Sequence, residues 1–336
     1  MRKLTFSLVF LAILFSKSSF SQTLIKIATL APQNTAWATH FQSAAAEISE
    51  LTDNRVKLKF YWGGSQGNEK KVLQKIKIGQ LHGGTFTPTD FQERYPDVNI
   101  IGLPFLFKSI DEVNFVREVL DKKMEEGFNE LGFEIFGFAG GGFAYIMSNR
   151  PVIRYSDMRN KKIWIPQGDL ISYQTMKALN LVPVPLVLTD VLTALQTGLI
   201  DIVSIPPVVA LALQWHTKIK YFTRVPVLYA MGFMAIDNKI MNKISAEDKN
   251  VLSKILRETY ALVDASNNKD TTDAINALFN VGIEEVDAIP DEIEDIRKSA
   301  LLVNQKMAEE GMFSKKLFDE IQILIEQYRQ NQKHHF

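Results

Sequence analysis

The first half of the chain alternates short apolar runs typical of strands with amphipathic segments typical of helices. Within 68–78, for example, the apolar residues Val72, Leu73 and Ile76 recur at helical spacing. Strands that alternate with helices favour a largely parallel sheet covered by helices, so we expect an α/β fold. The pattern predicts strands over 24–29, 55–62 and 82–86, and helices over 37–51, 68–78 and 111–131.

The pattern changes after Phe133, where two β-rich runs over 133–139 and 143–148 flank Gly140-Gly141-Gly142. We expect these glycines to form a flexible joint at which the chain crosses from one lobe to another. A long apolar strand over 225–237 is interpreted as the return crossing. Between the crossings, strands are expected over 161–165, 182–185 and 200–204, and helices over 170–179 and 190–197.

Two crossings make both lobes discontinuous in sequence. About 315 residues after a leader are long for a single core and sufficient for two lobes. We expect residues 22–141 plus 231–270 in the first α/β lobe, and residues 142–230 plus 271–336 in the second.

A long helix is predicted from Ser245, which forms a capping-box start with Asp248. The helical pattern then continues without Pro or Gly to about Asn280. About 34 helical residues extend about 50 Å, more than one lobe spans, so this helix is expected to lie across both lobes. Two further helices are expected over 291–311 and 315–330.

Residues 1–21 are typical of a secretory signal peptide. Arg2 and Lys3 precede an apolar run over 6–15, and Ser19 to Ser21 offer small residues for cleavage before Gln22. The apolar run is shorter than the roughly 20 residues that span a bilayer, although an anchor at the start of the chain is the alternative. No Cys occurs in the sequence, so neither a lipid anchor on Cys nor disulfides are expected.

The charge is balanced, with 38 basic and 38 acidic side chains, and residues 1–21 account for three of the basic ones. No basic block is longer than a pair such as Lys70-Lys71, and no interleaved aromatic and Arg pattern occurs. We therefore expect no nucleic-acid partner. His40, His82 and His216 lie apart from each other without zinc-ligand spacing, and no cofactor or metal is expected.

One motif indicates an enzyme instead. Gly63 to Gly67 fits G-x-S-x-G between a predicted strand and a predicted helix, and Asp201 and His216 follow in the order of a hydrolase triad. A secreted serine hydrolase using Ser65 is therefore one alternative. A ligand-free interaction protein is another.

A strand–loop–helix unit at 161–172 supplies the first candidates for ligand binding. Pro166 and Gly168 end the strand, and Asp169 is placed to cap the following helix. Ligands bind beyond the carboxyl ends of strands in open α/β sheets, so Trp164 and Gln167 are candidates to face a cleft. The alternative is that Trp164 is a buried sheet residue.

Three motifs carry a family resemblance: the stretch from Asn149-Arg150-Pro151 to Pro166, Ala194 to Asp201, and Gly102-Leu103-Pro104-Phe105-Leu106-Phe107. With their spacing, essentially the whole chain after the leader resembles the DctP-type substrate-binding proteins of TRAP (tripartite ATP-independent periplasmic) transporters. The resemblance implies a two-lobed periplasmic binding protein fold with crossing hinge strands and a lobe-spanning helix. It further implies a periplasmic location, a small organic ligand, no catalysis, and TRAP permease membrane subunits as partners.

The chain departs from this family where the substrate is held. Trp164 stands where most members have an arginine that clamps the substrate carboxylate, and Ala144 stands where a second basic residue is common. Arg offers a planar bidentate fork that no other side chain reproduces. We therefore expect an apolar or amphipathic ligand, as in a subgroup without the arginine, whose systems include a helical-repeat periplasmic partner. The alternative is that Arg154 or Arg159 replaces the lost charge. The expected ligand-binding residues are Leu30, Trp37, Phe86, Thr87, Ala144, Trp164, Gln167, Leu188, Ile205 and Pro206.

Overall fold

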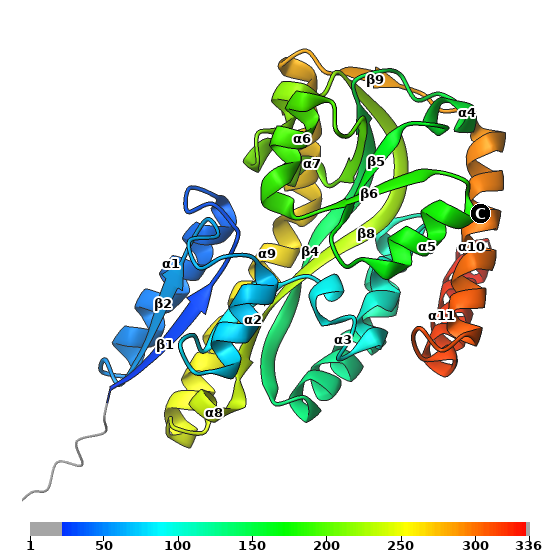
Figure 1. The fold of residues 1–336 in the computed structure, drawn as a ribbon. Helices are drawn as coiled ribbons and strands as arrows, with labels where there is room; N and C mark the ends of the chain where they lie inside the picture. Colours follow the sequence, from blue (N-terminus) through cyan, green and yellow to red (C-terminus); the bar gives the residue numbers. More distant parts are fainter. Residues whose placement is uncertain (1–21, 334–336) are drawn as a thin grey trace, which may run out of the picture.

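The computed structural model describes residues 22–333, so the predicted leader over 1–21 lies outside the described residues. Helices cover both faces of one long sheet (Figure 1). The strands are β1 (Thr23–Ala28), β2 (Val56–Tyr61), β3 (Gly83–Phe86), β4 (Phe133–Ser148), β5 (Lys162–Pro166), β6 (Val182–Leu186), β7 (Ile202–Ile205), β8 (Tyr221–Asp237) and β9 (Glu284–Val286).

The α-helices follow most of the predicted ranges. They are α1 (Ala36–Leu51), α2 (Glu69–Lys77), α3 (Ile110–Glu130), α4 (Tyr155–Met158), α5 (Leu170–Ala178), α6 (Val191–Thr197), α7 (Pro207–Ala212), α8 (Asn238–Met241), α9 (Ala246–Asn280), α10 (Pro290–Glu309) and α11 (Lys315–Lys333). The 3-10 helices are η1 (Pro88–Phe91), η2 (Pro96–Gly102), η3 (Leu188–Asp190) and η4 (Trp215–Lys218).

The sheet has the strand order β2-β1-β3-β8-β4-β7-β5-β6, and β9 pairs with β8. β1 is parallel to β2 and β3, and β5 is parallel to β6 and β7. We call the part built on β1–β3 lobe I and the part built on β5–β7 lobe II. β4 and β8 run antiparallel through both parts, so the largely parallel sheet that we predicted is correct for each end and wrong for the centre.

The chain crosses between the lobes at Gly140–Gly142 as predicted, but these glycines lie inside the continuous strand β4 and do not form a separate joint. A Cβ atom on Gly140 would lie 2.0 Å from the Tyr229 hydroxyl of β8, and one on Gly142 would lie 2.9 Å from Thr271 Oγ1 of α9. The register of β4 against β8 shifts between Gly140 and Gly142. Glycine is required here for close approach at an irregular point of the sheet.

A buried ion cluster fixes this point to two helices. Arg117 of α3 donates to Asp264 of α9 at 2.7 and 2.9 Å, to Asp121 and to the carbonyl of Phe138. Asp264 in turn accepts from the Gly140 N–H at 2.8 Å. Charge-assisted hydrogen bonds therefore replace sheet hydrogen bonds where the strand is irregular.

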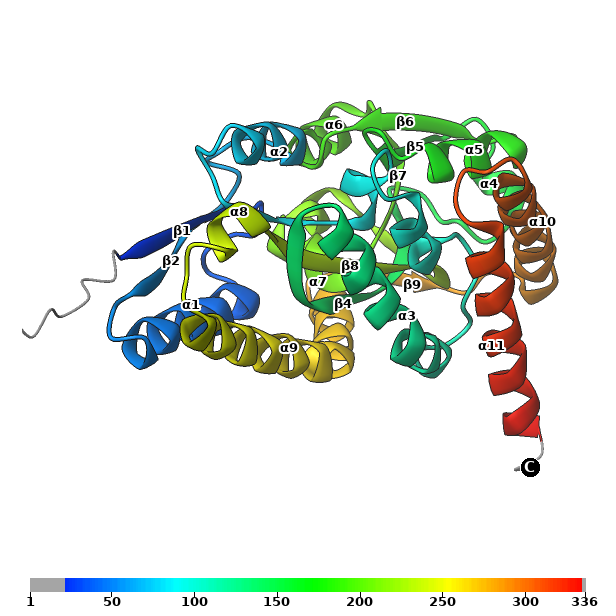
Figure 2. The same ribbon diagram turned by 90° about the horizontal axis from the view of Figure 1, so that it is seen from below.

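The long helix is confirmed as α9, with 35 residues, and the Ser245 hydroxyl accepts from the Asp248 N–H at its start. Its first half packs on Phe136 and Met234, and its last turns pack on Phe222. Figure 2 shows α9 extending along the crossing strands from α1 toward α7. The helix therefore covers one face of the sheet across both lobes.

The C-terminal helices lie on the other side of the crossing strands. Ile296 and Ala300 near the middle of α10 pack in lobe II, whereas Met307 near its end packs in a cluster with α3. Arg329 of α11 forms two hydrogen bonds with Glu112 of α3. This end of the chain therefore contacts both lobes. No helix among residues 22–333 is long and apolar enough to cross a membrane.

Candidate functional site

The carboxyl ends of the two strand sets face each other along the crossing strands. Phe86 at the end of β3 pairs with Phe233, which pairs with Phe138 of β4, while Ile205 at the end of β7 pairs with Tyr145 of β4. β3 and β7 run in opposite directions, because β3 is antiparallel to β8 and β7 is antiparallel to β4. The β4 segment between the two ends spans roughly 20 Å at about 3.3 Å per residue. We call this the interlobe region, and Phe86, Thr87, Ile205 and Pro206 lie at the strand ends that border it.

In lobe II, Trp164 is a buried residue with 5 % exposure. Its indole N–H donates to the carbonyl of Leu186 at 3.1 Å, and its ring meets Trp215 edge to face with centroids 5.1 Å apart. Leu188 and Ile205 belong to the same apolar cluster. In this arrangement Trp164 fills lobe II and has its one polar group satisfied inside the protein.

The other lobe II candidates surround this cluster. The backbone N–H of the exposed Gln167 donates to the same Leu186 carbonyl at 3.1 Å. Ala144 is buried and pairs with Leu228 of β8, which is half-buried. Pro206 is also buried and precedes α7. Trp164, Leu188 and Ile205 therefore form one apolar wall in lobe II, and Gln167 and Pro206 adjoin it along the chain.

In lobe I, the candidates sit at the ends of β1 and β3. Leu30 is half-buried and packs against Gly64, whereas Phe86 is buried in the core with its ring 5.2 Å from that of Phe91. Thr87 is exposed. Trp37 is half-buried at the start of α1, where its ring contacts Phe41 and Trp62. Phe86 thus supports the site through packing, and Leu30, Trp37 and Thr87 retain exposed surface.

The carboxyl groups of Asp90 and Asp169, which follow β3 and β5 in the chain, both have raised pKa values. Asp90 accepts hydrogen bonds from the backbone N–H and hydroxyl of Thr87, and burial together with the Glu69 carboxylate raises the pKa of Asp90 to about 7. Asp169 caps α5 through the Ser172 N–H at 2.9 Å, and burial raises its pKa as well.

Arg154 and Arg159 lie at the opposite end of β5. Both are exposed residues that flank α4, and the Arg159 guanidinium lies 5.2 Å from the centre of the Tyr155 ring. About five residues of extended chain, or roughly 15 Å, separate Arg159 from Trp164. Neither arginine occupies the position that replacement of the missing charge requires in this arrangement.

Sequence reasoning missed the residues that position the candidates. Trp215 packs on Trp164, and nothing in the local pattern around it indicated this contact. Gln92 accepts from the Leu170 N–H at 3.3 Å and so joins the end of η1 to the start of α5. The capping role of Asp90 could have been predicted from the sequence, because Thr87-x-x-Asp90 has capping-box spacing.

The hydrolase residues do not assemble. Ser65 lies in an exposed turn of lobe I. In lobe II, Asp201 accepts from the Lys162 N–H at 2.9 Å, and the His216 ring lies 3.4 Å from the carbonyl of Ala210. Among residues 22–333, no group of three His, Cys, Asp or Glu side chains is placed to hold a metal ion.

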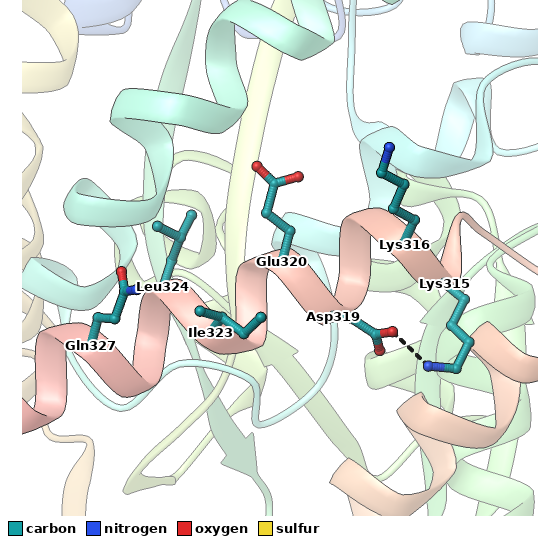
Figure 3. Close-up of a pocket in the computed structure, with 7 residues that line it drawn as sticks. All are labelled: Lys315, Lys316, Asp319, Glu320, Ile323, Leu324 and Gln327. Atoms are coloured by element: carbon teal, nitrogen blue, oxygen red, sulfur yellow. Dashed lines mark hydrogen bonds and ion pairs between the residues drawn. The ribbon is translucent and has the colours of Figure 1, made fainter.

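One hollow lies elsewhere, along one side of α11, and has a volume of about 570 Å³ (Figure 3). One ion pair, between Lys315 and Asp319 at 2.6 Å, crosses its rim. All its lining residues come from this single helix, so it is separate from the interlobe region. They are Lys315, Lys316, Asp319, Glu320, Ile323, Leu324 and Gln327.

The sequence of the chain is similar to those of known proteins. Residues 27–311 match the sequence profile of the bacterial extracellular solute-binding proteins of family 7, DctP. The C4-dicarboxylate-binding periplasmic protein DctP of Rhodobacter capsulatus is 23% identical over 252 residues, which cover 72% of this chain and 74% of that protein.

Solved structures share the fold. A TRAP periplasmic solute binding protein from Haemophilus influenzae with bound L-gulonate superposes with a TM-score of 0.83 at 20% identity, covering 90% of this chain and 100% of that one. The sugar acid binding protein from Advenella mimigardefordensis in complex with galactonate superposes with a TM-score of 0.84 at 17% identity, covering 91% and 99%.

Proposed function

Since the chain belongs to the DctP family, family 7 of the bacterial extracellular solute-binding proteins, we propose that it binds its solute in the interlobe region. As a member of this family it is a periplasmic solute-binding protein of the TRAP type and not an enzyme. Its ligand is a small organic molecule, and its family partners are TRAP membrane components. Cleavage of a leader before Gln22 and contact with a helical-repeat periplasmic partner are further parts of the proposal.

The proposed ligand is apolar or amphipathic rather than a simple carboxylate. One observation carries this: the indole of Trp164 is bonded to Leu186 and packed on Trp215, where a clamp for an acid would need a cation. A carboxylate that leaves water without a charged partner loses far more solvation than its contacts return. An apolar surface gains about 25 cal/mol for each Å² that it buries.

The proposed mechanism uses differential binding. Lobes I and II close on the solute by hinge motion about β4 and β8, and the closed form delivers it to the permease. The solute shifts the equilibrium toward the closed form because it contacts both lobes only there. Leu30, Trp37 and Thr87 would contact the solute from lobe I, while Gln167 and Leu188 would contact it from lobe II.

The test is native mass spectrometry on protein purified from periplasm, followed by identification of the released molecule. We expect one apolar or amphipathic molecule for each chain. Titration of stripped protein with L-gulonate, galactonate and succinate provides the opposing test, because the two structural relatives hold sugar acids. Micromolar binding of one of these acids would overturn the proposed ligand class. An empty protein that shows no compaction with any solute would favour the interaction-protein alternative.

Trp164 is tested separately, with the released molecule as ligand. Trp164→Arg places a charge in the apolar wall and is expected to weaken binding at least tenfold, an effect of about 1.4 kcal/mol or more. Trp164→Phe is the matched control, since it keeps an uncharged aromatic ring while it removes the hydrogen bond to Leu186 and part of the ring volume. Equal affinities for Trp164→Arg and wild type, with both folded by circular dichroism, would remove Trp164 from the site.

A further inference from the structure

The segment between η2 and α3 inserts a side chain into the core of the opposite lobe. Phe105 has 7 % exposure and packs with Val227 of β8 and Ile296 of α10 in the lobe II cluster. Its neighbours Leu106 and Phe107 belong to the cluster that contains α3 in lobe I. Phe105 is therefore a plug, a side chain of one lobe that is buried in the other.

The backbone of the plug is held in an unfavourable conformation. Phe105 has φ 58°, a left-handed value that bulky residues rarely adopt. Its N–H donates to the Val227 carbonyl at 2.6 Å, and its own carbonyl accepts from Arg297 at 3.0 Å. Asn304 donates to the Pro104 carbonyl at 2.9 Å. Such a conformation persists only where the surroundings fix it, and it is a reason to suspect a functional role.

The middle of α10 supplies the anchor. Arg297 is buried, lies 5.7 Å from the centre of the Phe105 ring and also donates to the Phe107 carbonyl at 3.3 Å. The Arg297 side chain has 8 % exposure, and burial lowers the pKa of its guanidinium. A buried guanidinium is costly unless its donors are used, so these carbonyls and Arg297 hold each other in place.

The plug and α9 lie on opposite faces of the crossing strands. Val227, which contacts the plug cluster, points to one face of β8, whereas Phe222 and Met234 pack against α9 on the other. A change in the angle between the lobes bends β4 and β8 between these two supports. It must therefore either draw Phe105 out of lobe II or rearrange the segment that carries it.

We propose that Phe105 is a conformational latch, which holds the lobes in the arrangement seen here and must shift for the lobes to change their angle. The latch controls the proposed hinge motion, but it does not depend on which solute is bound. Removal of the side chain should therefore spread the lobes over a wider range of arrangements. The change should be visible before any solute is added.

The distance between the lobes provides the test. The chain has no Cys, so Gln42→Cys in α1 and Gln196→Cys in α6, both at exposed positions, allow specific labelling for single-molecule energy transfer. We expect Phe105→Ala to raise the fraction of molecules outside the main wild-type distance about tenfold, since truncating a buried aromatic readily shifts a two-state balance that much. Phe105→Leu keeps most of the plug and should raise that fraction about threefold.

Val152→Ala is the matched control. Val152 is buried in the same lobe II cluster but lies outside the plug segment, so its truncation should leave the distance distribution unchanged. A wild-type distribution in folded Phe105→Ala would overturn the latch, as would an equal change in Val152→Ala. If Phe105→Ala does not fold, Phe105→Leu decides by the same criteria. A chain that shows the expected change but binds no solute would refute the proposed function and leave the latch standing.

Discussion

The replacement Gly140→Ala adds one methyl group at the most crowded point of the crossing strands. The new carbon would lie 2.0 Å from the Tyr229 hydroxyl and 2.9 Å from the Asp264 carboxylate. Tyr229 is buried, and Asp264 is bonded to both Arg117 and the Gly140 N–H, so neither neighbour is free to move. The substitution should therefore both separate β4 from β8 and disrupt a hydrogen bond of the ion cluster.

The expected cost follows from those two routes. Overpacking a close-packed interior costs about 1–3 kcal/mol. Loss of a hydrogen bond to a charged group costs about 1.5–3 kcal/mol more. A combined loss of about 3–5 kcal/mol would be a large part of the roughly 5–15 kcal/mol that stabilises a typical domain.

Urea unfolding followed by circular dichroism measures this loss, and Gly141→Ala is the matched control. A Cβ on Gly141 would lie 3.3 Å from the Ala230 side chain, so we expect a cost of less than about 1 kcal/mol. Both variants lose the same backbone freedom in the unfolded chain, so that contribution cancels in the comparison. Adding Tyr229→Phe to Gly140→Ala removes the nearest atom and should recover about 1 kcal/mol. Equal stabilities of Gly140→Ala and Gly141→Ala would show that the close approach is not what requires glycine.

Three further outcomes are expected. Because the pKa of Asp90 is raised to about 7 in the folded chain, folding favours the protonated form of this carboxyl group. Its contribution to the free energy of unfolding is therefore lost as the pH rises from about 4 to 7. Asp90→Asn should make the free energy of unfolding, measured with urea, fall less over this pH range. Ser245→Ala should lower the free energy of unfolding by about 1 kcal/mol, because the Asp248 N–H loses its cap, and an unchanged urea midpoint would contradict this. The double replacement of Arg154 and Arg159 by Ala should leave solute affinity within about twofold of wild type in calorimetry, whereas a large loss would restore these arginines as ligands.

The sequence pattern correctly predicted those helix ends that depend on residues close by in the sequence. Ser245 with Asp248 fixed the start of α9, and the absence of Pro and Gly allowed its length to be predicted. Asp169 was correctly predicted as the cap of α5 for the same reason. In each case the physical cause lies within four residues in the sequence.

Features that depend on contacts between residues far apart in the sequence could not be predicted from the local pattern. Gly140 is a glycine because of Tyr229, which follows 89 residues later, so its role was mistaken for flexibility. The antiparallel centre of the sheet depends on pairing between β4 and β8, which the strand pattern alone does not contain. The partner of Trp164 is Trp215, on a 3-10 turn that no periodicity marked. Whether the predicted site residues bind a solute stays a prediction.

The pairing of distant segments also sets the order in which the chain can fold. Lobe II is bounded by β4 and β8. Glu112 of α3 is bonded to Arg329 of α11, which follows it by 217 residues in the sequence. During synthesis from the N-terminus, the early strands and α3 are made long before the segments that cover them. Contacts between residues so far apart form slowly, since the loop between them must first be closed. The packing of α11 on α3 can therefore form only after the last helix has been made, so the final turns of the chain complete a surface that was laid down more than 200 residues earlier.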